Sequence, residues 1–110
     1  MKGHKLIQDR FRRNRGGYTR LLKIYCERCG NFVALYQKDG PGALKRMYLD
    51  RIFLPKTFTY TGALSYKKLP NLVCSECKQV IGVPMLYQKE KRPAFRLFEG
   101  SVIKKISRAQ

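Results

Sequence analysis

The sequence predicts a mostly β domain, and three observations support this fold class. Short segments rich in β-forming residues recur along the chain, turn signals such as Asp39-Gly40-Pro41-Gly42 separate them, and β-type segments flank both of two cysteine pairs. A length of 110 residues, 44% of them hydrophobic, is enough for one domain with one core and too short for two ordinary domains. We therefore expect residues 18–110 to form a single domain that follows a basic, flexible arm at residues 1–17.

The first half of the domain is expected to hold two strands and a short helix. Residues 18–25 and 31–38 are rich in β-formers, and they precede and follow the first cysteine pair. In residues 43–53 the apolar positions recur at spacings of three and four, which favours a short helix and leaves a strand as the alternative. Residues 57–61 are strand-like, and a loop or a short strand is expected there.

The second half repeats this order around the second cysteine pair. Residues 80–89 form an apolar strand, in which Pro84 indicates a sheet edge or a bulge, and residues 95–98 and 102–106 are predicted as the last strands. The letters Leu-Tyr-Gln-Lys follow both pairs, at 35–38 and at 86–89. This similarity favours a twofold internal repeat.

The four cysteines form two C-x-x-C pairs, Cys26 with Cys29 and Cys74 with Cys77, and no cysteine is left over. Two residues between cysteines let a tight turn point both thiolates at one tetrahedral zinc ion, at bonds of about 2.3 Å, and two such turns complete a closed site. The expected cofactor is therefore one structural zinc ion that joins distant segments. Two disulfides, a redox-active pair and an iron or iron–sulfur site are the alternatives.

The turn after each pair needs a residue that tolerates a positive φ angle. Gly30 supplies it after the first pair, whereas Lys78 occupies that place in the second pair. The second turn is therefore expected to be strained or to have a different shape.

A large positive charge is the second strong signal. The chain has 24 Lys and Arg against 7 Asp and Glu, a formal net charge of +17, which points to a polyanionic partner. The N-terminal arm is especially basic and ends at Gly16-Gly17, although a merely solvated tail is the alternative for it. Several acids, among them Asp39, Asp50 and Glu90, lie beside Lys or Arg, so surface ion pairs are expected for them rather than catalysis.

No stretch is long and apolar enough for a membrane span, and the N-terminus lacks the apolar core of a secretory signal. We expect a soluble protein of the reducing cytoplasm that has no membrane partner. The only histidine, His4, lies in the arm, and no other residue pattern indicates catalysis, so an enzyme with a small-molecule substrate is not expected.

The long separation of the two pairs, with residues 30–73 between them, exceeds the roughly 15–20 residues of simple zinc ribbons. From Tyr25 to Phe98 the chain resembles the β-tent zinc family, which includes the Yippee proteins, the zinc-bearing type B methionine sulfoxide reductases and the regulatory domain of RIG-I-like RNA sensors. The resemblance implies two small antiparallel sheets joined at a zinc ion held by the four cysteines. It implies no catalytic residue, because the reductases use an additional cysteine that this chain lacks.

Aromatic residues next to basic ones, as in Arg10-Phe11-Arg12 and Tyr66-Lys67-Lys68, favour RNA over DNA, because bases stack on aromatic rings while cations contact phosphates. A ribosome-associated or other ribonucleoprotein component is the expected setting. The candidate contact residues are Arg10, Arg12, Arg13, Arg15, Arg20, Lys67, Lys68, Lys104 and Lys105. A DNA-binding regulator, a Yippee-like protein-interaction adaptor with an apolar groove between its sheets, and an enzyme that uses such a groove are the alternatives.

Overall fold

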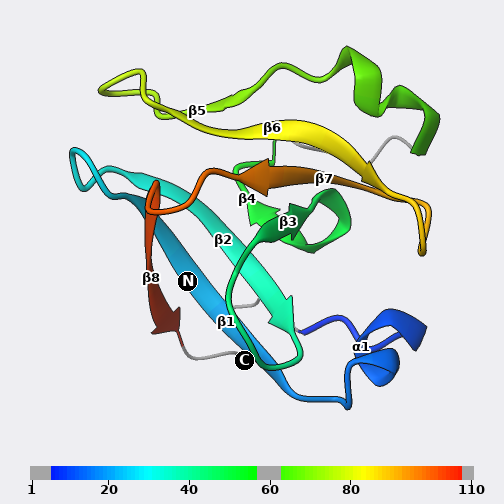
Figure 1. Cartoon of the computed structure of the whole chain (residues 1–110). Coiled ribbons are helices and arrows are strands. Elements are labelled where there is room, and N and C mark those ends of the chain that lie inside the picture. Colours follow the sequence, from blue (N-terminus) through cyan, green and yellow to red (C-terminus); the bar gives the residue numbers. More distant parts are fainter. Residues whose placement is uncertain (1–5, 57–62, 108–110) are drawn as a thin grey trace.

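The computed structural model describes residues 6–56 and 63–107. Within them, two four-stranded antiparallel sheets lie one above the other (Figure 1). The first sheet has the order β4 (Ile52–Leu54), β2 (Phe32–Asp39), β1 (Thr19–Cys26), β8 (Val102–Ser107). The second has the order β3 (Arg46–Tyr48), β7 (Arg92–Leu97), β6 (Val80–Tyr87), β5 (Leu72–Val73). The predicted mostly β class with two antiparallel sheets is confirmed.

One face of β1 and β2 forms a wall of the apolar core between the sheets. Leu22 lies opposite Tyr36 and Ile24 opposite Ala34, and all four side chains are buried. The second sheet supplies the facing residues of the core, chiefly Met47, Ile81 and Phe95. Burial of side chains of this size is the main contribution to the stability of so small a domain.

The short helix expected at residues 43–53 is not present. The segment forms β3, a single 3-10 turn η1 (Leu49–Arg51), and β4. β3 pairs with β7 of the second sheet and β4 pairs with β2 of the first, so the chain crosses between the sheets at the turn. These pairings satisfy backbone groups at two sheet edges, and the 3-10 turn between them produces an apolar spacing that resembles that of a helix.

The other predicted strands are present with small shifts in their ends. Pro84 lies in β6 beyond the last residue paired with β5, where only β7 adjoins the strand, so its missing N–H costs no ladder hydrogen bond. The stretch 57–61 lies outside the described residues. A second 3-10 segment, η2 (Ala63–Lys68), precedes β5. In the described part of the chain, no helix is long and apolar enough to cross a membrane.

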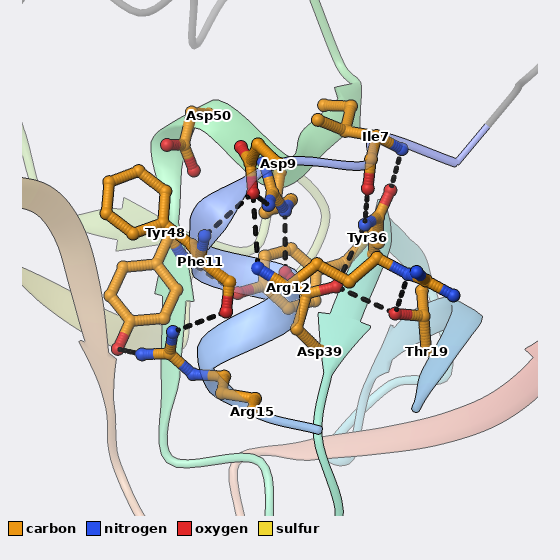
Figure 2. Close-up of polar contacts among 12 residues, drawn as sticks. Ile7, Asp9, Phe11, Arg12, Arg15, Thr19, Tyr36, Asp39, Tyr48 and Asp50 are labelled. Carbon is orange, nitrogen blue, oxygen red and sulfur yellow. Dashed lines mark hydrogen bonds and ion pairs between the residues drawn. The ribbon is translucent and has the colours of Figure 1, made fainter. Parts of the chain in front are cut away.

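The N-terminal segment, residues 6–17, lies against the domain and contains one short helix, α1 (Arg10–Asn14) (Figure 2). Asp9 caps this helix by accepting hydrogen bonds from the backbone N–H groups of Phe11 and Arg12. The backbone of Ile7 exchanges two hydrogen bonds, of 2.6 and 2.8 Å, with the buried carboxamide of Gln37. The expected flexible arm is thus docked over the described part of its length.

Candidate metal centre and basic surface

The two cysteine pairs lie in turns that join β1 to β2 and β5 to β6, and both turns are found at the same end of the molecule (Figure 1). Cys26 is the last residue of β1 and is fully buried, and Cys74, which directly follows β5, is buried as well. Cys29 and Cys77, at the outer ends of the turns, are more exposed. The sheets therefore converge at the cysteines.

The two turns have the same hydrogen-bond pattern. The N–H of Gly30 donates to Cys26 O at 2.8 Å, and the N–H of Lys78 donates to Cys74 O at 3.0 Å. The φ angle is 80° at Gly30 and 66° at Lys78, so of the two expected alternatives, a strained second turn or one of different shape, the structure has the strained turn. Lys78 adopts the left-handed conformation at a cost of roughly 1–2 kcal/mol, and its ammonium group donates to the carbonyl of Ser75 within the same turn.

All four sulfur atoms lie within 4.8 Å of one another, with Cys26 to Cys77 at 3.6 Å and Cys29 to Cys74 at 3.5 Å. A tetrahedral ion with bonds of about 2.3 Å to sulfur requires sulfur–sulfur distances of roughly 3.8 Å. A disulfide requires about 2.05 Å, so the thiols are free. The cluster has the size and the ligand chemistry of a closed four-thiolate metal site.

A carboxamide from each turn reaches across to the buried cysteine of the other turn. Asn31, two residues after Cys29, approaches Cys74 Sγ at 3.9 Å, and Gln79, two residues after Cys77, approaches Cys26 Sγ at 3.9 Å. Gln79 also donates to the carbonyl of Ser101 at 3.2 Å, which fixes its side chain. N–H donors directed at sulfur stabilise thiolates, and groups around metal ligands hold them in position.

The thiols affect one another strongly. The backbone N–H of Cys77 stabilises the Cys74 thiolate and, against the opposing effect of burial, lowers the pKa of that thiol to about 6. The backbone N–H of Asn31 favours the Cys29 thiolate, but loss of solvent and the adjacent thiols outweigh it and raise the pKa of Cys29 to about 12. Four thiolates this close repel one another, and a divalent cation removes that repulsion.

The predicted nucleic-acid contacts do not form one patch. Arg10, Arg13, Lys67, Lys68, Lys104 and Lys105 are exposed. By contrast, Arg12 donates through Nε to Thr19 at 2.9 Å, and Arg15 forms two hydrogen bonds to Glu90, at 2.8 and 2.9 Å. Arg20 lies over the ring of Tyr18, and its Nε atom is buried without a hydrogen-bond partner among the described residues.

Among the residues that the structure describes, four acids form ion pairs with arginines, and all of these pairs except Arg92 with Glu90 join segments that are distant in sequence. Arg51 is 1% exposed and contacts Asp9 and Asp39 at 2.7 and 2.8 Å. Arg92 is 2% exposed and contacts Asp50 at 2.7 Å and Glu90 at 3.0 Å. Its guanidinium also lies 4.1 Å from the centre of the Phe11 ring and 3.8 Å from that of Tyr48. Sequence analysis missed both arginines, because nothing local distinguishes a buried arginine from an exposed one.

Comparison with models of protein families, with curated proteins and with solved structures found no match to this chain. The resemblance to β-tent zinc proteins therefore stays a prediction. The cluster of four cysteines that the resemblance implied is present.

Proposed function

We propose that this protein is a zinc-stabilised module that binds nucleic acid, with RNA favoured over DNA, through its cationic surface. The zinc has a purely architectural role, because four thiolates leave no open coordination position for a substrate. A reducing compartment such as the cytoplasm suits this site, since it keeps the thiols available to the metal.

The pairing of acidic residues with arginines of the same chain is the observation that carries the nucleic-acid proposal. Four of the seven acids, Asp9, Asp39, Asp50 and Glu90, are engaged in ion pairs with only three arginines. Two of these arginines are almost completely buried. The domain thus pairs more than half of its acids with its own arginines, and few acids remain to offset the other lysines and arginines, whose excess gives the net charge of +17. A surface of this kind attracts a phosphate backbone.

Aromatic residues beside lysines favour a single strand over a duplex. The rings of Tyr25 and Phe32 meet edge to face at 5.8 Å, and Lys105 Nζ lies 5.5 Å from the centre of the Tyr25 ring. Unpaired bases stack on such rings, whereas the bases of a duplex are already stacked on each other. Because single-stranded targets are commoner in RNA, the proposal places RNA before DNA.

A salt titration of binding tests the proposal. Single-stranded RNA, single-stranded DNA and duplex DNA of equal length are compared by fluorescence anisotropy. Each phosphate contact adds roughly 0.7 to the slope of log affinity against log salt on a single strand, so a steep slope and the tightest binding to single-stranded RNA are expected. Binding to none of the three at low salt would refute nucleic-acid binding, and a preference for the duplex would refute the choice of single-stranded RNA.

Metal analysis tests the zinc. Native mass spectrometry of protein purified under reducing conditions is expected to give one zinc ion per chain, since four cysteines form one tetrahedral site. Protein free of metal, or holding a different metal, would contradict this part of the proposal.

A protein-interaction adaptor is the second candidate, and one observation favours it. A groove of about 440 Å³ is lined mainly by apolar residues of both sheets, among them Phe32, Leu54 and Leu72. Association through such a groove would not weaken with salt, because it depends on apolar contact rather than on ion release. The same titration therefore separates the two candidates.

A further inference from the structure

A second groove, of about 630 Å³, lies where β7, β8 and the segment 43–46 meet. Its apolar wall consists of Leu44, Leu97, Phe98 and Val102. Phe98, the residue after the end of β7, is 43% exposed, so its ring is accessible from the groove. The size falls in the range of roughly 300–1,000 Å³ that is typical of small-ligand sites.

Three exposed cations reach this groove from three separate parts of the chain. Lys45 comes from the segment before β3, Arg96 from β7 and Lys104 from β8. Arg46 lines the groove too, but its guanidinium lies 4.4 Å from the centre of the Tyr87 ring and donates to the Tyr48 hydroxyl at 3.2 Å. One acid, the exposed Glu99, is part of the lining. Positive charge therefore predominates around an apolar wall.

A buried lysine beside this groove feels the same excess of positive charge. Lys38 is 7% exposed, and its Nζ donates to the carbonyl of Gly40 at 2.8 Å. Burial lowers the pKa of Lys38, and the charges of Arg20 and Lys104 lower it further. An anion bound near Lys104 would offset this repulsion.

We infer that this groove binds a nucleotide, with the phosphate held by Lys45, Arg96 and Lys104 and the base stacked on Phe98. A phosphate alone would leave the apolar wall uncovered, and an apolar ligand alone would leave the cations without partners. The nucleotide is either a free mononucleotide or one unpaired nucleotide of an RNA strand. In the second case the inference rests on the proposed function and assigns it a place.

One lysine of the groove and one exposed lysine outside it provide a matched test. Lys104 of β8 lies opposite Ile24, whose side chain faces the space between the sheets, and Lys89 lies in the turn between β6 and β7, outside the groove lining. The variants Lys104→Glu and Lys89→Glu change the net charge equally, so non-specific attraction falls equally in both. Both residues are exposed, so both variants should fold, which the melting temperature of each checks.

The probes are adenosine monophosphate, inorganic phosphate and a short single-stranded oligoadenylate. Lys104→Glu is expected to weaken nucleotide binding by about tenfold or more, and Lys89→Glu by clearly less. Phe98→Ala should weaken it by about tenfold through lost stacking. Glu99→Gln should tighten it, because a repelling carboxylate is removed. If Lys104→Glu weakens binding of the monophosphate, the groove is a site for free nucleotides. If it weakens binding of the oligoadenylate alone, the groove is a site for a nucleotide of a strand.

Three results would overturn the inference. Equal losses of nucleotide binding for Lys104→Glu and Lys89→Glu would place the nucleotide outside this groove, while leaving the proposed RNA binding intact. Inorganic phosphate that competes as well as the monophosphate would show that the base is not bound. If neither the monophosphate nor the oligoadenylate binds, the inference is refuted. The failure of the oligoadenylate to bind would refute the proposed function as well.

Discussion

Replacing Arg51 by methionine should detach the N-terminal segment from the domain. The Arg51 side chain is 2% exposed and joins Asp9, which is 34% exposed, to Asp39, which is 4% exposed. Its removal leaves the buried carboxylate of Asp39 without its cation. Breaking a buried ion pair in this way usually lowers the free energy of unfolding by about 3–5 kcal/mol. Asp9→Asn removes only the more exposed ion pair, at about 1 kcal/mol or less, because asparagine caps a helix as well as aspartate does.

Urea denaturation of the zinc-loaded protein measures these free energies. Arg13→Met is the matched control, because Arg13 is an exposed arginine of α1, and a change within about 0.5 kcal/mol is expected for it. The double variant Arg51→Met/Asp9→Asn should lose less than the sum of the two single losses, since both remove the same pair. An Asp9→Asn variant as stable as the wild type, with a double variant no less stable than Arg51→Met alone, would show that Asp9 does not pair with Arg51 and that the segment is a free arm, with its arginines available to a polyanion.

Three further outcomes are expected. Cys74→Ser should lose the metal and unfold the domain, because binding of a structural zinc ion contributes about 10–16 kcal/mol and the total free energy of unfolding of a domain is about 5–15 kcal/mol. A native circular dichroism spectrum of this variant would contradict the prediction. Gln79→Ala should release zinc to a chelator about tenfold more readily than the exposed control Gln88→Ala, since a donor to a ligand sulfur is lost. Burial acts to raise the pKa of Asp9 and Glu90, but hydrogen bonds from arginines outweigh it and hold both below their ordinary values. The ion pairs therefore stabilise the fold fully above about pH 5, and this contribution is lost as the pH falls through the folded-state pKa values. The melting temperatures of the wild type and of Asp9→Asn should therefore converge in acid. A difference in melting temperature that stays constant with pH would contradict this coupling of stability to the protonation of Asp9.

Short sequence patterns were sufficient to predict the candidate metal centre and the strands beside it. A C-x-x-C turn positions two thiolates whatever surrounds it, and the β-forming residues of 18–25 and 31–38 favour strands without knowledge of the partner sheet. For the second turn, the residue types left strain and a different shape open, and the structure has the strained turn. Lys78 takes a glycine-like conformation because the metal turn and the carbonyl of Ser75 hold it there.

The segment 43–53 was predicted incorrectly because two structures share its apolar spacing. A helix and a strand–turn–strand unit both bury Leu44, Met47 and Ile52, and only the free edges of β7 and β2 decide between them. Those edges belong to parts of the chain that are distant in sequence, and strand pairing outweighs a weak local helix preference.

The sequence by itself determined the four cysteines of the candidate metal site, the mostly β class and the excess of positive charge, because each depends on residue type and on short spacing. The tertiary structure alone decided where that charge is exposed. It buried Arg51 and Arg92 against acids from other segments, docked the N-terminal segment, and brought Lys45, Arg96 and Lys104 to one groove. The sequence around a long charged side chain does not indicate which residue it will contact. Its role therefore depends on which distant strands the sheets bring together.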